Sequence, residues 1–273
     1  MNARDPHRFI NELDDASLER LVARLEGRAR DHVFARLLDK YVGYLAMPAT
    51  TRILEIGCGT GAVLRTIARR PDFGGQATGI DHCDAFIGHA RNLAGAEGLS
   101  DRLDFRMGDA HRLDYPGATF DVVIAHTLIS HAAAPLAVLS EMGRVVKPGG
   151  HVVVFDGDYA SLTYAFADHE FGTKMDAALA KATFNNPRVM RDIPRLLPGL
   201  GLKLVTGWGD AVAEIGHGSY YKSFAETYVP YVKRANVLPE EAIDIWFDAQ
   251  MRATASGTFF AACNYYTYIA QPI

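Results

Sequence analysis

Hydrophobic positions recur in two patterns along the middle of the chain: short unbroken runs, and stretches in which apolar residues are spaced three and four apart. The runs are typical of buried strands, and the wider spacing is typical of helices with one buried face. These runs, and shorter mixed stretches between the helices such as 76–80 and 103–107, predict strands near 52–56, 76–80, 103–107, 121–125 and 151–155. The spaced stretches predict helices near 61–70, 84–95 and 134–146. Because strands and helices alternate, we expect an α/β fold with a parallel sheet covered on both faces.

The two ends of the chain depart from this alternation. Before it, Asp14 or Asp15 is suited to cap one helix, and a second helix is expected over 33–45. After it, the sequence predicts a sixth strand over 203–208 and a tyrosine-rich seventh strand over 263–270. Further helices are expected near 171–183, 187–197 and 220–234, with one more opening at Pro239.

A glycine-rich turn joins the first expected strand to the helix after it, in the sequence Glu55-Ile56-Gly57-Cys58-Gly59-Thr60-Gly61. Glycine lets the backbone approach a ligand closely and tolerates a positive φ. In α/β folds, a strand followed by such a turn and a helix is a frequent ligand site. Gly57, Gly59 and Ala62 also match the dinucleotide fingerprint, and a tight turn without a ligand is a further alternative. The turn alone therefore does not identify the ligand.

Four further motifs follow this turn in order. Asp81 ends the second expected strand, and residues 108–110, Gly-Asp-Ala, follow the third. Residues 120–126 form the fourth strand, and residues 141–155 contain a helix end, a Lys-Pro-Gly-Gly turn and the fifth strand. This ordered set resembles the class I S-adenosylmethionine-dependent methyltransferases, in particular the UbiE-like small-molecule branch. The resemblance covers residues 50–160 and weakens beyond them.

The resemblance implies a single methyltransferase domain over 1–273, with a Rossmann-like, seven-stranded and mostly parallel sheet in the order 3-2-1-4-5-7-6. In this frame we expect a helical cap at 1–48, a cofactor-binding core at 50–156, and helical insertions at 157–200 and 211–257. Both insertions leave the carboxyl ends of strands, where α/β sheets bind ligands, and both are too long for simple turns. We interpret them as a lid over the substrate. Permanently docked helices that only thicken the domain are the alternative.

The resemblance also implies S-adenosylmethionine as the cofactor. Asp81 would accept the ribose hydroxyls, although it is also suited to cap the next helix, and Asp109 would accept the adenine amino group, although it also fits a plain turn. Glu55 would orient the turn or the methionine end of the cofactor. His82 is expected either on the adenine or exposed to solvent. The full expected cofactor set is Glu55, Gly57, Gly59, Gly61, Asp81, His82, Asp109, Ala110 and the backbone of His126.

Methyl transfer from a sulfonium is an in-line displacement, so aligning the reactants and excluding water matter most, and orientation alone supplies about 7–11 kcal/mol. A general base is optional. Candidate bases are His126, His131, Asp158 and His217. A structural hydrogen bond is the alternative role for His131. Contacts with a flat or aromatic substrate are expected from Tyr159, Tyr220 and Tyr221, with packing as the alternative for these side chains.

The composition narrows the choice of partners. A net charge of −4 with 22% charged residues leaves no strong basic field, which disfavours nucleic acid. No apolar run approaches the roughly 18 residues of a membrane span, and the polar first residues lack the apolar core of a signal peptide. Three distant cysteines and scattered histidines give no metal-ligand spacing, so we expect no metal, no disulfide framework and a reducing cytoplasm. The sequence leaves a homo-oligomer open.

The expected function is S-adenosylmethionine-dependent methyl transfer to an O, N or C atom of a small molecule in specialised or cofactor metabolism. Two alternatives stay open. A methyltransferase-like protein would use the bound sulfonium for cyclisation or decarboxylation, because a fixed positive charge stabilises a developing anion. An NAD-dependent oxidoreductase also fits the glycine turn.

Overall fold

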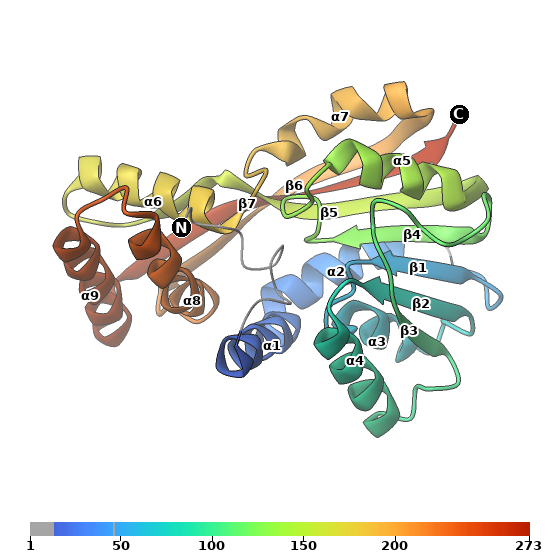
Figure 1. The fold of residues 1–273 in the computed structure, drawn as a ribbon, viewed down its shortest axis with the longest axis horizontal. Coiled ribbons are helices and arrows are strands. Elements are labelled where there is room, and N and C mark those ends of the chain that lie inside the picture. The colour runs from blue at the N-terminus through green and yellow to red at the C-terminus, as the bar shows by residue number, and fades with distance from the viewer. Residues whose placement is uncertain (1–13, 46) are drawn as a thin grey trace.

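The computed structural model describes residues 14–45 and 47–273, and it builds them around a seven-stranded sheet (Figure 1). The strands are β1 (Arg52–Ile56), β2 (Gln76–Asp81), β3 (Leu103–Met107), β4 (Phe120–His126), β5 (Val146–Tyr164), β6 (Leu202–Gly216) and β7 (Phe259–Pro272). Their order is β3-β2-β1-β4-β5-β7-β6, which confirms the expected topology. Neighbouring strands are parallel from β3 through β5, and β7 runs antiparallel to β5 and β6.

Helices cover both faces of this sheet. Within the described ranges they are α1 (Asp15–Arg30), α2 (His32–Tyr44), α3 (Ala62–Ala68), α4 (Asp84–Ala96), α5 (Pro135–Val145), α6 (His169–Thr183), α7 (Ile193–Leu196), α8 (Tyr220–Ala235) and α9 (Glu240–Ser256). The helices α5 and α7 lie on one face, and α2, α3 and α4 lie on the other (Figure 1). No helix in residues 14–45 and 47–273 is both long and apolar enough to cross a bilayer.

The buried strand β1 divides the core into two clusters. Successive side chains of a strand point to opposite faces. Ile53 packs with the α2, α3 and α4 cluster, whereas Leu54 and Ile56 pack with the α5 cluster. The same alternation places Glu55, at the end of the strand, on the side of Ile53. A carboxylate is therefore directed toward the helices that precede and follow β1.

The three strands β5, β6 and β7 are much longer than the expected strands 151–155, 203–208 and 263–270. Pairing of β5 with β7 continues through Asp156, Gly157 and Asp158, whose residue types indicate a turn when the sequence is taken alone. The first parts of the two insertions are therefore strand, and the helices α6 and α8 begin close to their expected positions, near 171 and 220. These two helices and α9 gather around the projecting ends of the long strands (Figure 1).

Helix α1 contacts α2 and α3 beside the parallel strands, and it also contacts α8 beside the long strands β5, β6 and β7. Its first turn is capped by Asp14, whose carboxylate accepts a hydrogen bond of 2.7 Å from the backbone N–H of Ser17. Asp31 caps α2 in the same way, at 2.9 Å from the N–H of Val33. Leu21, on the buried face of α1, packs against Cys83 and Phe86 beside α4.

Candidate active site

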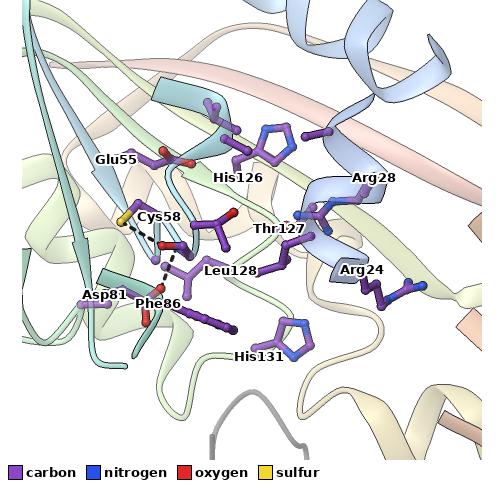
Figure 2. Close-up of a pocket in the computed structure, with 18 of the residues that line it drawn as sticks. Arg24, Arg28, Glu55, Cys58, Asp81, Phe86, His126, Thr127, Leu128 and His131 are labelled. Carbon is purple, nitrogen blue, oxygen red and sulfur yellow. Dashed lines mark hydrogen bonds between the residues drawn. The ribbon is translucent and has the colours of Figure 1, made fainter. Parts of the chain in front are cut away.

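A cavity of about 480 Å³ opens at the carboxyl ends of β1, β2 and β4 (Figure 2). Its wall includes the glycine turn, the residues that follow β2, β3 and β4, and side chains of α1 and α2. Tyr159, Phe184 and two tyrosines of α8 complete it. The volume lies in the range of pockets that hold small ligands and cofactors.

The glycine turn has a backbone conformation that requires glycine. Gly57, Gly59 and Gly61 have φ angles of 68°, 52° and 74°, which side-chain-bearing residues rarely adopt. A Cβ on Gly61 would also lie 2.5 Å from the ring of Phe105. Gly57 and Gly59 line the cavity, whereas Gly61 lies behind them as the residue before α3. Bare backbone therefore faces a ligand at the first two glycines, and the third lets the turn pack against β3.

Asp81, at the end of β2, holds the glycine turn in place. Its buried carboxylate accepts one hydrogen bond of 2.9 Å from the N–H of Gly59 and another of 3.0 Å from the N–H of Cys83, the residue before α4. Burial raises the pKa of Asp81 even though both N–H donors act to lower it. The carboxylate lines the cavity as well. Asp81 thus tethers two elements and faces the site where a ribose is expected.

Glu55 is a buried carboxylate without its full set of partners. The side chain is 2% exposed, and its Oε2 atom has no hydrogen-bond partner among the described residues. Burial, with a smaller contribution from the negative charge of Asp81, raises its pKa well above the usual value. An acidic group that is buried, lines a cavity and lacks a partner is suited to a cationic or hydrogen-bond-donating group of a ligand.

The segment after β3 contributes Asp109, Ala110 and His111 to the cavity wall. The Asp109 carboxylate accepts hydrogen bonds from the backbone N–H of His111 at 2.9 Å and lies 2.8 Å from its Nδ1. The side chain is 65% exposed, so it stays open to a ligand while it shapes its own turn. His82, after β2, also lines the cavity, with its Nδ1 3.5 Å from Asp81. All the polar residues expected at the adenine end are therefore brought together.

His126 ends β4 at the cavity, where its ring is buried against Phe155 with the ring centres 4.5 Å apart. The Tyr41 hydroxyl of α2 lies 3.0 Å from its Nδ1 atom. Burial lowers the pKa of His126 well below 6.5, so the imidazole is neutral near pH 7. Which ring nitrogen carries the proton then depends on the direction of the bond with Tyr41.

The residue after His126 has a strained backbone. Thr127 has a φ of 56°, in a region that β-branched residues seldom occupy. Its N–H donates a 2.6 Å hydrogen bond to the carbonyl of Phe155, which holds the end of β4 against β5. Thr127 and Leu128 both line the cavity. Strain of this kind is found preferentially at functional sites, and no sequence motif identified it.

Three of the expected substrate and base residues, Asp158, His217 and Tyr221, lie outside the cavity lining. Asp158 is buried, and its Oδ2 pairs with Arg191 at 2.7 Å. His217 is near Thr254, with its Nδ1 3.2 Å from that carbonyl, where it joins the start of α8 to α9. Tyr221 donates its hydroxyl proton to the carbonyl of Val212 at 3.0 Å. All three contacts are internal to the fold. In contrast, the expected residues His131, Tyr159 and Tyr220 do line the cavity.

Helix α1 supplies cavity residues that no motif identified. Arg24 and Arg28 line the wall opposite the glycine turn (Figure 2), and Leu25 lines the cavity close to Gly59. Glu26, on the other side of the helix, accepts hydrogen bonds of 2.6 Å from Thr60 in the turn and 2.6 Å from Arg65 in α3. The signal in the sequence is the four-residue spacing of two arginines along an otherwise apolar helix face. In residues 14–45 and 47–273, no cluster of His, Cys, Asp and Glu has a metal-binding arrangement.

Comparisons with known proteins agree with this geometry. Residues 54–154 match a family model described as a methyltransferase domain. A phosphatidylethanolamine N-methyltransferase from Cereibacter sphaeroides is 36% identical over 140 residues, which cover 48% of this chain and 67% of that protein. An S-adenosyl-L-methionine-dependent Diels-Alderase, iccD, from Talaromyces variabilis is 29% identical over 198 residues, which cover 72% of this chain and 58% of that protein. The crystal structure of the cyclase SpnF superposes with a TM-score of 0.65 at 20% identity, covering 100% of this chain and 99% of that chain.

A sheet in this order, with a glycine turn and two acidic strand ends around one cavity, defines a nucleotide-cofactor-binding domain of the Rossmann type. The family match and the methyltransferase relative narrow the class further. The chain belongs to the class I S-adenosylmethionine-dependent methyltransferases.

Proposed function

We propose that the protein transfers a methyl group from S-adenosylmethionine to an O, N or C atom of a small molecule in specialised or cofactor metabolism. The observation that carries the proposal is the composition of the cavity. One end combines bare glycine backbone with the carboxylates of Glu55, Asp81 and Asp109, and the other end is aromatic, with Tyr159, Phe184 and Tyr220. The first end suits a cationic nucleoside, and the second suits a flat apolar acceptor.

The residues present fit the cofactor. Asp81 would hold the ribose, and Asp109 with the Ala110 amide would hold the adenine. Glu55, whose Oε2 lacks a partner among the described residues, would hold the cationic amino group at the methionine end. When bound, S-adenosylmethionine supplies a methyl group on a positively charged sulfur, which is a good leaving group.

The contribution of the chain is to orient the reactants and to exclude water, which is worth about 7–11 kcal/mol. Helix α1, Thr127 and Tyr220 enclose the space beyond the glycine turn. Two histidines are placed to move a proton there. Neutral His126 accepts one at Nε2 if its Nδ1–H donates to Tyr41, and His131 is the second candidate.

A second candidate function is cyclisation by a bound sulfonium whose methyl group is not transferred. It is supported by the Diels-Alderase relative, since its match extends over 72% of this chain and so beyond the cofactor core. In such a reaction the aromatic end would position an unsaturated acceptor, and the fixed positive charge would stabilise developing negative charge.

The two functions are separated by the fate of the cofactor. The protein would be incubated with methyl-labelled S-adenosylmethionine and an extract of small metabolites, and S-adenosylhomocysteine and labelled products would be measured together. Methyl transfer predicts equal amounts of both. Conversion of an acceptor without any S-adenosylhomocysteine would support cyclisation and contradict the main proposal.

We propose a reducing, cytoplasmic setting and no nucleic-acid partner. Supporting the first, the three cysteines, Cys58, Cys83 and Cys263, are buried and free, as is usual where thiols stay reduced. Supporting the second, the net charge is −4. The proposal allows a monomer or a homo-oligomer.

A further inference from the structure

Arg24 has surroundings that differ from those of the other charged groups at the cavity. Its guanidinium carbon lies 4.7 Å from the ring centre of Tyr220, 4.9 Å from that of Phe224 and 5.1 Å from that of Tyr228. These three rings are spaced four residues apart along α8, so they form one face of that helix. We call Arg24 and these three rings the arginine cage.

The arginine cage holds a positive charge without a carboxylate partner. Among the described residues, no ion pair includes Arg24, and its Nη1 atom is buried without a hydrogen-bond partner. Ring faces stabilise a cation, but they do not accept the in-plane N–H bonds of a guanidinium. Burying a charged group whose N–H donor has no acceptor destabilises the folded protein, unless a ligand supplies the acceptor.

The acidic groups of the cavity lie at its other end. Glu55 is on the glycine-turn side with Asp81, and Arg28 is the α1 residue whose charge influences Glu55 and His126. Arg24 instead interacts electrostatically with Tyr220 and Tyr228 of α8. Arg24 therefore lies at the aromatic end, against the rings of α8, whereas the charge of Arg28 acts on Glu55 and His126 and also on Tyr159.

We propose that Arg24 is a specificity-determining residue and that the acceptor carries an anionic oxygen group, of the carboxylate type, on a flat apolar body. The guanidinium edge would pair with the oxygens, and the guanidinium would stay packed against the cage rings. The apolar body would lie against Phe34, Tyr159 and Phe184, where Tyr159 and Phe184 are stacked with ring centres 3.4 Å apart. This inference rests on the proposed function, because it assigns the aromatic end to the acceptor.

The test is calorimetric binding of matched probes to the protein saturated with S-adenosylhomocysteine. Naphthoate is compared with naphthamide, and cinnamate with cinnamamide, so each pair differs in charge but hardly in shape. The wild-type protein is expected to bind the carboxylates about ten-fold or more tightly than the amides. Arg24→Gln is expected to remove that preference, and Arg24→Lys to keep part of it, because lysine retains the charge without the planar edge.

Arg20→Gln is the matched control, since Arg20 lies one turn earlier on α1, on the exposed side, where it donates a hydrogen bond of 2.7 Å to the Ser17 hydroxyl. It should keep the full preference for carboxylates. Equal binding of carboxylates and amides by the wild type, or no binding of either, would overturn the proposal, as would an undiminished preference in Arg24→Gln. If Arg24→Gln does not fold, equal binding of both members of each pair by Arg24→Lys would overturn it. Failure of the wild type to bind S-adenosylhomocysteine would instead contradict the proposed function.

Discussion

The Asp81 carboxylate fixes the glycine turn and the start of α4 with two hydrogen bonds and still faces the cavity. Replacing it by asparagine removes the charge and exchanges one acceptor oxygen for a donor. Loss of a hydrogen bond to a charged group costs about 1.5–3 kcal/mol. We therefore expect Asp81→Asn to weaken binding of S-adenosylmethionine and S-adenosylhomocysteine alike, by roughly ten- to hundred-fold.

Calorimetric titration of both ligands checks this expectation. Asp104→Asn is the matched control, because Asp104 is an exposed carboxylate on the neighbouring strand β3 that pairs with Arg106. Unchanged affinity in Asp81→Asn would remove Asp81 from the binding site. A loss for only one of the two ligands would show that Asp81 does not contact the ribose that they share.

We expect Glu55 to make cofactor binding depend on pH. Burial and the charge of Asp81 raise its pKa, so the free protein holds a proton there over a wider pH range than usual. A cationic group bound beside Glu55 favours the ionised carboxylate, so binding should release a proton and affinity should increase as the pH rises through the raised pKa. Glu55→Gln cannot release this proton, and its profile should be flatter with weaker binding at high pH.

Titration of S-adenosylhomocysteine in two buffers with different ionisation enthalpies measures the released proton directly. The buffer-dependent heat should be present in the wild-type protein and reduced in Glu55→Gln. If both proteins release the same number of protons, another group is responsible and Glu55 is not beside the cationic end.

At this scale the sequence predicted the residues that belong to a local motif. Gly57, Gly59, Asp81 and Asp109 follow strands directly, so their places at the cavity depend only on where each strand ends. Arg24 and Arg28 were not predicted, because they reach the cavity through the packing of distant helices. The position of His217 depends on tertiary packing in the same way. Its local sequence does not show that its ring lies beside Thr254 of α9.

The Glu26 carboxylate joins helix α1 to the glycine turn and to α3 at the cofactor end. Glu26 Oε1 accepts from both Thr60 and Arg65 at 2.6 Å, and the Arg65 side chain is only 5% exposed. Glu26→Gln leaves a buried arginine with a weaker partner, at a cost of about 1–3 kcal/mol, although Glu97 still pairs with Arg65. We expect α1 to open more often, with faster hydrogen exchange across Asp15–Arg30 and faster release of S-adenosylhomocysteine.

Exchange measured by mass spectrometry and stopped-flow release check this prediction. Glu19→Gln, an exposed substitution on the same helix, should change neither. If Glu26→Gln lowers global stability but leaves the release rate unchanged, α1 is a fixed wall of the site and does not move for ligand exchange.

The elements themselves were predicted well where strands are short and buried on both faces. Strands β1 and β4 coincide with apolar stretches, and β2 and β3 lie at the positions that the alternation of strands and helices predicts. The extended strand β5 was not predicted, because Asp156 and Asp158 interrupt its pattern. Their cost is offset inside the fold: Asp156 accepts from the N–H groups of Ser130 and Gly157, and Asp158 pairs with Arg191. Such compensation comes from residues distant in the sequence.

In the whole molecule, the order and the lengths of the strands determine which elements surround the cavity. The parallel half of the sheet presents its carboxyl ends to the cofactor side, and the projecting β5, β6 and β7 position α8 opposite α1. The order could be predicted, because it follows from the resemblance. The meeting of α1 with α8 could not, because it depends on strand lengths that the sequence pattern does not reveal.

The central claim is that this cavity binds S-adenosylmethionine. The most direct measurement is a calorimetric titration of the full-length protein with S-adenosylmethionine, with S-adenosylhomocysteine and with NADH. We expect the first two to compete for one site with a dissociation constant on the micromolar scale, and NADH neither to bind there nor to displace them. Tight binding of NADH with no response to S-adenosylmethionine would contradict it.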